Sequence, residues 1–391
     1  MTKINRQPLD IGILDNHDSF KDKKTTMTRS NTSKNRLGFV ALKIAKLLSI
    51  FVAALFILVI AFAIYAANSD RARFPLPILI KASSFTDKNL NQYPSQLKVQ
   101  GNWLIDGQGN QVLLKGIMIA DPLIADVKDD FNQRLFKQLH ELGVNVIRIP
   151  VHPITWEGAS DYLWRYLDKA VRWAGEYGMY VIIDWHSIGN VKTGSAPEGS
   201  NMFTHTWENT TGFWNVVSAY FAGAPNVLFE VFNEPESITV SEWRAAASEL
   251  VRIIRLQGAQ QVVIVGGVDY ASDLSWVMET PIADPNIAYA EHVYPIHSMA
   301  DWNIHFGEVS KSYPVLITEW GFIEEYINSE YAYLIGDEKS FGEPFLDYLD
   351  EHQIGWLACW YDDNWQPAMF TPGFKDLNPY GDFVFEHLSL P

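Results

Sequence analysis

The sequence predicts an α/β protein of the (β/α)₈-barrel class, and three observations lead to this prediction. Eight short apolar stretches, each of strand length, alternate with amphipathic stretches between residues 97 and 388. No Gly-rich phosphate loop follows the first of them, which disfavours the alternative, a doubly wound open sheet. Polar residues stand where the apolar stretches end, and in a parallel barrel these ends share one rim.

The expected elements follow one another regularly along this part of the chain. A hairpin comes first, because the turn-forming run 106–110 (DGQGN) lies between two apolar stretches of the segment 97–114. The predicted strands are 112–118, 144–149, 179–184, 227–231, 261–265, 287–292, 314–318 and 355–360. The predicted amphipathic helices between them are 131–142, 162–177, 212–221, 241–257 and 343–351.

The N-terminal part predicts a membrane-anchored protein. Residues 47–67 carry no charge and are numerous enough to cross a bilayer as a helix. Basic residues dominate the flank 1–46, so the positive-inside rule places that polar, disordered tail in the cytoplasm and the rest outside it, in the periplasm or extracellular space. A signal peptide cleaved near Ala67 is the alternative. Residues 68–96, interrupted by prolines, are expected to form a stalk, and residues 97–391 a single exported domain.

Charge and cysteine content narrow the class of partner. Residues 1–74 hold 12 Lys and Arg against 5 Asp and Glu, whereas the remainder holds 18 against 41. A body this acidic disfavours nucleic acid, whose binding needs clustered basic residues, and fits a neutral substrate. Cys359 is the single cysteine, so no disulfide forms within the chain, and it is expected to pack as a small apolar residue.

Two glutamates at strand ends predict the chemistry. Glu234 follows the apolar run that begins at Val227, and Glu319 follows the run 314–317. Placing a carboxylate beside a buried strand is costly, so two on parallel strands of one barrel need a functional reason. Glycoside hydrolysis uses such a pair: an acid that protonates the leaving oxygen, and a carboxylate on the other side of the anomeric carbon.

The remaining strand ends supply groups that such a pair needs. Arg148, by its charge and hydrogen bonds, is expected to keep Glu319 ionised, while burial and the second carboxylate keep Glu234 protonated. The sequence implies no cofactor. Asp184, His186 and His292 include residue types that bind zinc, but no compact pair such as H-E-x-x-H accompanies them, so no metal site is predicted.

Six short sequence motifs, in the same order along the chain, make it similar to glycoside hydrolase family 5, the cellulase family of a retaining clan of (β/α)₈ barrels. The resemblance covers residues 97–388. The matching motifs are the Arg of 145–148 (NVIR), 181–186 (VIIDWH), 229–235 (FEVFNEP), 292–294 (HVY), 317–321 (ITEWG) and Trp360 on the last strand.

This resemblance implies a role for each matching polar residue. Glu234 is the acid/base and Glu319 the nucleophile. Asn233 holds the sugar 2-hydroxyl, and Arg148 and Tyr294 position and polarise the nucleophile.

The resemblance also implies that His186 and His292 bind the sugar at the cleavage point, with Trp360 as the floor beneath it. The chain departs from the family where Met118 follows the first strand's Lys-Gly-Ile, a position that often holds Asn. Other tryptophans in rim loops are candidates for a glucan track, since flat sugar faces stack on aromatic rings. These are Trp156, Trp185, Trp207 and Trp365.

Several other polar residues are expected to lie outside the catalytic set. Glu230, in mid-strand, is expected to be an interior residue paired within the barrel. The remaining histidines near strand ends are expected to be loop or rim residues, and the two aspartates after Trp360 to face water. These are His152, His205, His297, Asp362 and Asp363.

The sequence therefore predicts a membrane-anchored, retaining endo-β-1,4-glucanase acting on β-glucan outside the cytoplasm. β-Mannanase, β-1,3-glucanase and glycosylceramidase activities remain open within the family, because loops around the cleft decide specificity. A non-catalytic sugar-binding protein displayed on the membrane is the alternative from another class.

Overall fold

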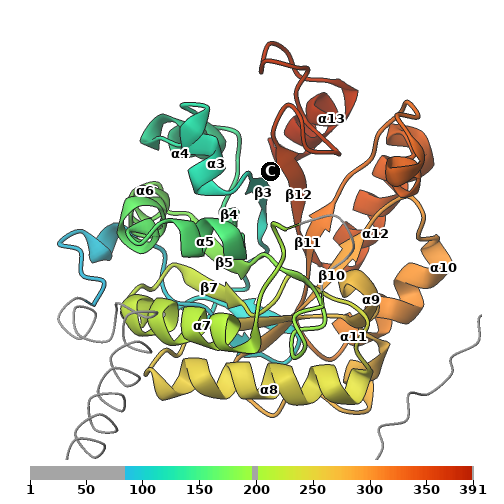
Figure 1. Cartoon of the computed structure of the whole chain (residues 1–391). Helices are drawn as coiled ribbons and strands as arrows, with labels where there is room; N and C mark the ends of the chain where they lie inside the picture. Colours follow the sequence, from blue (N-terminus) through green and yellow to red (C-terminus); the bar gives the residue numbers. More distant parts are fainter. Residues whose placement is uncertain (1–83, 196–200, 390–391) are drawn as a thin grey trace, which may run out of the picture. The chain divides into compact units, whose positions relative to one another are not determined.

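The computed structural model describes residues 84–195 and 201–389, and its centre is a closed barrel of eight parallel strands (Figure 1). The first and last barrel strands pair through Trp356 and Lys115, which closes the ring and confirms a (β/α)₈ barrel rather than an open sheet. In chain order the strands are β3 (Lys115–Ile119), β4 (Val146–Val151), β5 (Tyr180–Trp185), β7 (Val227–Glu230), β9 (Val263–Gly266), β10 (Ile287–Val293), β11 (Val315–Trp320) and β12 (Gly355–Tyr361).

Alternation along the strands decides which side chains point into the barrel. In β4, Val146 packs in the inner apolar cluster, while Ile147 and Ile149 pack in the outer cluster beneath the helices. Arg148 is therefore on the inner face, one step above Val146 toward the C-terminal rim. The inner cluster fills the barrel below the rim, so the site has an apolar floor. Its other members include Leu114, Ile182, Leu228, Ile264, Ala290, Leu316 and Leu357.

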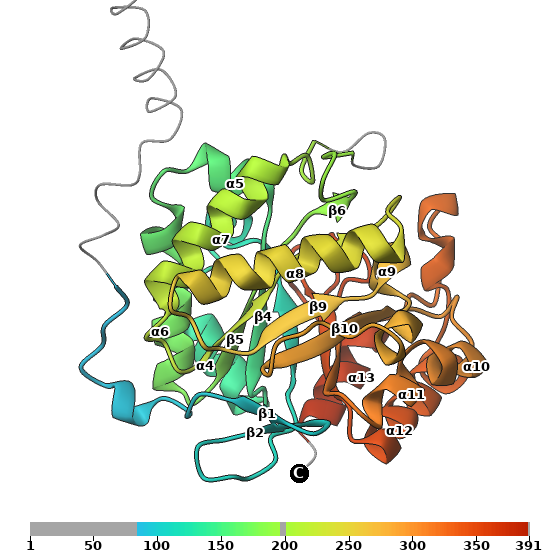
Figure 2. The same ribbon diagram turned by 90° about the horizontal axis from the view of Figure 1, so that it is seen from below.

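Helices cover the outside of the barrel (Figures 1 and 2). The long ones are α4 (Gln133–Glu141), α6 (Asp168–Glu176), α7 (Trp207–Phe221), α8 (Val240–Leu256), α12 (Glu343–His352) and α13 (Pro379–Leu388). Shorter helices are α3 (Pro122–Val127), α5 (Pro153–Gly158), α9 (Val268–Ala271), α10 (Met299–Trp302) and α11 (Glu308–Ser310). Short stretches of 3₁₀ or π-helix are η1 (Leu90–Gln92), η2 (Leu163–Leu167), η3 (Ser275–Met278), η4 (Asn303–Gly307), η5 (Ser329–Leu334) and η6 (Glu338–Gly342).

Helix α8 shows how the local sequence sets an element's start. Thr239 and Glu242 form a reciprocal capping box, which satisfies backbone donors that a helix start leaves unpaired. Trp243 and Leu250 then bury one face of the helix against the barrel. The predicted helix 241–257 therefore differs from the observed one by a single residue at each end.

The predicted hairpin turn at 106–110 is confirmed, since Ile105 and Gln111 form an antiparallel bridge across it and the Val112 amide donates to the Leu104 carbonyl at 2.9 Å. Another hairpin, which was not predicted, precedes it. Strands β1 (Lys98–Gln100) and β2 (Trp103–Ile105) reverse at Gly101, whose φ of 62° suits a residue without a side chain. The run 106–110 forms a second turn after β2, in which the Asp106 carboxylate accepts from backbone amides. Leu97 and Leu104 join the inner apolar cluster, so the hairpin closes the N-terminal end of the barrel.

Residues 84–96, which precede the predicted domain boundary, pack on the outside of the barrel. Phe85 and Tyr93 are buried in the outer apolar cluster, and the Phe85 amide donates to the Tyr220 carbonyl at 2.8 Å. Arg172 pairs with Asp87 at 2.8 Å and lies over the Phe85 ring. The described part of the predicted stalk, residues 84–96, is thus part of the packed domain.

The predicted cytoplasmic tail, 1–46, and the predicted membrane segment, 47–67, lie outside the described residues. Within the ranges 84–195 and 201–389, no helix has both the length and the apolar character needed to cross a bilayer.

Candidate active site

The eight side chains predicted for the site all lie at the C-terminal rim of the barrel, and the structure brings them together. Seven of them come from the last two residues of a barrel strand or from the segment that follows it, and Arg148 comes from the middle of β4. They are Arg148 of β4, His186 after β5, Asn233 and Glu234 after β7, His292 and Tyr294 at and beyond the end of β10, Glu319 of β11 and Trp360 of β12.

Arg148 is the central cation of the site. Its guanidinium is fully buried and donates to Glu319 Oε1 at 2.6 Å, to Glu230 Oε2 at 2.6 Å and to Asn233 Oδ1 at 2.8 Å. Asp184 Oδ2 lies 3.1 Å from the same group. Three carboxylates around one guanidinium fix its orientation, which in turn fixes the carboxylate of Glu319 and the amide of Asn233.

Glu319 is held in its ionised form. One oxygen accepts from Arg148, and the other accepts from the Tyr294 hydroxyl at 2.8 Å. Burial by itself would raise the pKa of Glu319, but the positive charges of His292 and Arg148 and the Tyr294 hydrogen bond outweigh it and hold the pKa well below its usual range. A carboxylate with both oxygens oriented and no proton is suited to attack as a nucleophile.

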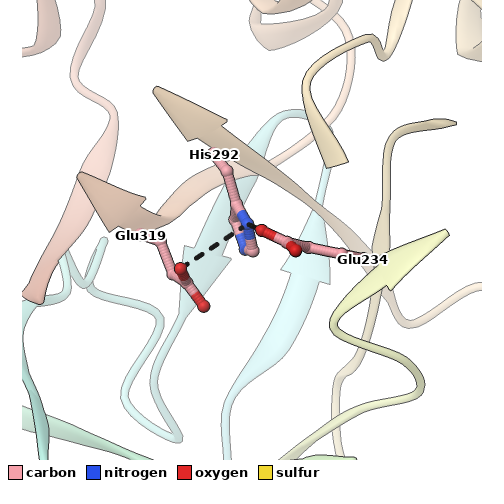
Figure 3. Close-up of side chains that lie close together, drawn as sticks. All are labelled: Glu234, His292 and Glu319. Carbon is pink, nitrogen blue, oxygen red and sulfur yellow. Dashed lines mark hydrogen bonds and ion pairs between the residues drawn. The ribbon is translucent and has the colours of Figure 1, made fainter. Parts of the chain in front are cut away.

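The pKa of Glu234 is moved in the opposite direction. Burial and the negative charge of Glu319 raise its pKa, while a hydrogen bond with His292 opposes the rise. The distance from Glu234 Oε1 to His292 Nδ1 is 3.0 Å, and that nitrogen lies 3.8 Å from Glu319 Oε2 (Figure 3). The Glu234 side chain keeps 13% of its surface exposed, so it reaches solvent at the rim. A protonated carboxyl in this position is suited to act as a general acid.

A two-residue ladder places Glu234. Strand β6 (Ile188–Gly189) pairs in parallel with β8 (Glu234–Pro235), and the Glu234 amide donates to the Ser187 carbonyl at 3.1 Å. This ladder extends β5 and β7 beyond the barrel and turns Glu234 toward Glu319. Sequence reasoning missed it, because two residues leave no periodic pattern.

His186 and Trp360 stand side by side at the rim, with ring centres 5.6 Å apart. His186 Nδ1 lies 2.6 Å from Asp184 Oδ2, and burial lowers the histidine's pKa well below its usual value, so its ring is neutral at neutral pH. Asp184 thus links His186 to Arg148. Cys359 is buried beside Trp360, as predicted, and its sulfur lies 3.6 Å from the Tyr294 hydroxyl.

Predictions for residues around the catalytic set are partly confirmed and partly wrong. Glu230 is an interior residue, as predicted, bonded to Arg148 and to the Thr318 hydroxyl. Trp185 was wrongly placed in the glucan track: it is fully buried and donates to Thr210, because strand alternation turns it outward under α7 while Asp184 points inward. The other three candidate tryptophans are half-buried, namely Trp156, Trp207 and Trp365.

Two further positions are Asp362, whose predicted exposure is wrong, and Met118, where the chain departs from the family pattern. Asp362 was expected to face water, but it is 2% exposed and pairs with Lys128 at 3.1 Å, a partner from the α3–α4 loop that the sequence does not place beside it. Met118, which stands where the family often has Asn, contacts the Arg148 guanidinium through its sulfur. A thioether is a weak acceptor, so Arg148 relies on its carboxylate partners.

Glu234, His292 and Glu319 each offer a ligand atom within 4.8 Å of the other two, a spacing that a metal ion can use. Their bonding disfavours it. Both oxygens of Glu319 already accept hydrogen bonds, and the guanidinium of Arg148 lies 2.6 Å from one of them, where it repels a second cation. The alternative ligand Asp184 is bonded to Arg148 in the same way.

The fold and the site together define a class: (β/α)₈ barrels that carry, at the C-terminal rim, two carboxylates whose pKa values are moved in opposite directions, the arrangement that glycoside hydrolysis uses. A model of the cellulase family, glycosyl hydrolase family 5, matches residues 105–365. The chain belongs to glycosyl hydrolase family 5.

Individual relatives agree with this family. The chain is 28% identical over 243 residues to Endoglucanase A of Butyrivibrio fibrisolvens, covering 60% of this chain and 53% of that protein. It is 26% identical over 300 residues to Endoglucanase E-5 of Thermobifida fusca, covering 71% and 58% respectively. The chain thus spans about half the length of the curated relatives it matches.

Among solved structures, a β-glucanase of Saccharophagus degradans in complex with cellotetraose superposes with a TM-score of 0.73 at 27% identity, covering 78% of this chain and 96% of that one. The catalytic domain of the Thermobifida fusca endoglucanase has a TM-score of 0.64 at 22% identity, covering 75% and 97%. The similarity to both structures spans nearly their whole length.

Proposed function

We propose that this protein is a retaining endo-β-1,4-glucanase. The observation that carries the proposal is the pair Glu234 and Glu319, whose carboxylate oxygens lie within 4.8 Å and whose pKa values are moved in opposite directions. A close pair favours a covalent glycosyl-enzyme intermediate and retained configuration, whereas an inverting pair stands farther apart to admit a water molecule.

In the proposed reaction, Glu234 protonates the leaving oxygen while Glu319 attacks the anomeric carbon from the other face. Glu234, now ionised, then takes a proton from the water that hydrolyses the intermediate. Arg148 and Tyr294 orient Glu319 through the hydrogen bonds described above. Asn233, whose carbonyl oxygen is held by Arg148, keeps its amide group free to donate to the sugar 2-hydroxyl.

His186, His292 and Trp360 complete the proposed sugar site at the cleavage point. Trp360 offers an aromatic face as a floor, and the neutral ring of His186 offers Nε2 to a sugar hydroxyl. His292 lies beside Glu234 and Glu319, and its positively charged ring provides a hydrogen-bond donor between them.

Two observations favour β-1,4-glucan as the substrate. The curated relatives described above are endoglucanases, and the Saccharophagus degradans β-glucanase was solved with cellotetraose. β-Mannan, β-1,3-glucan and glycosylceramide are the alternatives, since rim loops decide among them. The full-length protein is assayed on carboxymethyl-cellulose, mannan, laminarin and a glycolipid, and we expect reducing sugar from carboxymethyl-cellulose. No release from any of the four contradicts the proposal.

We also propose that residues 47–67 anchor the protein in a membrane, with residues 1–46 in the cytoplasm and the catalytic domain outside it. The uncharged run and the basic flank support this orientation. Carbonate extraction of membranes tests the anchor, since an anchored protein stays in the pellet. Protease added to intact cells or spheroplasts tests the orientation, and a protected catalytic domain contradicts it.

Replacing Tyr294 with Phe removes the hydroxyl that donates to Glu319 at 2.8 Å. We expect the pKa of Glu319 to rise, because that bond stabilises its ionised form. Glu319 acts when ionised, so activity is lost as pH falls through its pKa, and in the variant this loss should occur at a pH higher by roughly one unit. The pH profile of kcat/KM on a soluble glucan measures the shift.

The matched control for this variant is Tyr313→Phe, at a half-buried tyrosine that packs on Tyr289 outside the site. Its acidic limb should coincide with that of the unmodified protein. An acidic limb that does not move in Tyr294→Phe would show that the hydroxyl has no part in setting the ionisation of Glu319.

A further inference from the structure

Glu234, the proposed acid/base, lies beyond the last residue of its barrel strand, β7. There the backbone of residues 233–236 is bonded to residues 185–189 by three hydrogen bonds, each 3.1 Å long. The Asn233 amide donates to the Trp185 carbonyl, the Glu234 amide to the Ser187 carbonyl and the Glu236 amide to the Gly189 carbonyl. The position of Glu234 therefore depends on what fixes the segment 185–189.

The side chain of Ser187 fixes this segment to a distant part of the chain. It is fully buried, and its hydroxyl lies 2.7 Å from the Phe203 carbonyl and 2.6 Å from His205 Nδ1. A carbonyl only accepts, so the hydroxyl donates to Phe203 and its oxygen accepts from His205 Nδ1. Ser187 thus bonds Glu234 through its carbonyl and residues 203–205 through its hydroxyl.

His205 was expected to be a loop or rim residue, and it lies just before α7, but only 3% of its surface is exposed. Burial lowers its pKa, against the opposing effect of nearby backbone carbonyls, so the ring is neutral at neutral pH. The ring also packs edge-on against Phe232, with ring centres 5.1 Å apart. His205 therefore contacts the segments that lead into both strands of the ladder, Ser187 before β6 and Phe232 before β8.

Two other contacts help to place this region, and both act elsewhere. Asn190 Nδ2 donates to the Ser237 carbonyl at 2.9 Å, beyond the far end of the ladder. His292 bonds the Glu234 carboxyl group and leaves its backbone untouched. The Ser187 hydroxyl, by contrast, belongs to the residue whose carbonyl bonds Glu234 itself.

We propose that Ser187 and His205 are positioning residues for Glu234, which hold the two-residue ladder so that the Glu234 carboxyl group reaches the leaving oxygen. The inference rests on the glycosidase function proposed above. Removing either side chain leaves a buried hydrogen-bond partner unpaired and allows the ladder to shift. A displacement of about 1 Å is enough to weaken a catalytic contact severely.

The leaving group distinguishes a misplaced acid from a damaged barrel. Glucan cleavage needs a proton from Glu234, whereas a dinitrophenolate leaves as an anion and needs none. We expect Ser187→Ala to lower kcat/KM on glucan roughly 10- to 100-fold, the range that misplacement of a general acid costs. Its kcat/KM on a dinitrophenyl β-cellobioside, which reports the steps up to the glycosyl-enzyme, should stay within about twofold of the unmodified protein.

His205 supplies a second pair of variants, which also test the proposal if Ser187→Ala does not fold. His205→Ala removes Nδ1 and should produce the same split between the two substrates. His205→Asn places an amide nitrogen near the position of Nδ1, so it can still donate to the Ser187 hydroxyl. This conservative variant should recover most of the glucan activity that His205→Ala loses.

The matched control is Ser218→Ala, at a fully buried serine of α7 whose hydroxyl donates to the Trp214 carbonyl. It loses the same group outside the site and should behave as the unmodified protein on both substrates. An equal loss on glucan and on the dinitrophenyl substrate in Ser187→Ala, or no loss on either, overturns the proposal.

The same measurements separate this inference from the proposed function. If the unmodified protein cleaves both substrates and Glu234→Ala shows the split, but Ser187→Ala and His205→Ala do not, this inference alone fails. If the unmodified protein cleaves neither substrate, the proposed function fails first.

Discussion

Glu319→Ala should lower kcat on a soluble β-1,4-glucan by roughly 10⁴-fold or more, the scale seen when a nucleophile is removed. The side chain supplies the attacking oxygen, and Glu234 cannot replace it, because an acid/base residue lies on the leaving-group side of the anomeric carbon. Reducing-sugar release measures kcat, and calorimetric titration with cellotetraose measures affinity, which should remain. The variant also frees Arg148 from one carboxylate while Glu230 and Asp184 still bind it, so the barrel should fold.

Azide makes this test specific. A small anion that fits the space of the missing carboxylate should restore cleavage of an activated aryl glycoside in Glu319→Ala and form an α-glycosyl azide, because it attacks from the face that Glu319 occupied. The control is Glu330→Ala, at an exposed glutamate of η5, which should retain full activity. A Glu319→Ala protein that hydrolyses glucan at the normal rate would show that a different residue is the nucleophile. An unmodified protein that binds cellotetraose but releases no sugar would identify a sugar-binding protein.

Glu234→Ala should lower kcat/KM on glucan by roughly 10² to 10⁴-fold, the usual contribution of general acid catalysis. The effect should depend on the leaving group. A sugar hydroxyl leaves poorly without a proton, whereas a dinitrophenolate leaves readily as an anion and needs no acid. The first step on a dinitrophenyl glycoside, followed as a burst of phenolate, should therefore be affected much less than glucan cleavage.

The stereochemistry of azide trapping distinguishes the two glutamates. In Glu234→Ala, azide attacks the glycosyl-enzyme intermediate from the face opposite Glu319 and should give a β-glycosyl azide. An α-glycosyl azide from this variant would mean that the two roles are exchanged. Loss of activity that is equal for glucan and for the dinitrophenyl glycoside would contradict an acid role for Glu234.

The barrel and its catalytic centre could be predicted from sequence because the necessary signals are local. Each buried strand is a continuous apolar run, and parallel strands in a barrel bring their C-terminal ends to one rim. The polar residues at the ends of these runs were therefore enough to bring Arg148, Glu234 and Glu319 into one site without any known distance. The boundaries of the eight strands came within a few residues for the same reason.

The supporting contacts could not be predicted, because they join segments far apart in the sequence. Asp121 and His152 lie on different loops, and so do Lys128 and Asp362, and nothing local pairs them. Trp185 was misplaced for a different reason: at a strand end, a shift of one residue changes the face on which a side chain lies. The hairpin of β1 and β2, which reverses at Gly101, was not predicted, because the segment 97–105 carries a weaker turn signal than 106–110.

The packing of residues 84–96 determines where the enzyme can be shortened. A protein that begins at residue 97, the boundary suggested by sequence, would lose Phe85 and Tyr93 and leave an uncovered apolar surface beside Phe221. It would also leave Arg172 without Asp87. A soluble version for crystallisation or calorimetry should therefore keep the chain from Ser84 onward, since a shorter one risks aggregation that would be mistaken for an inactive catalyst.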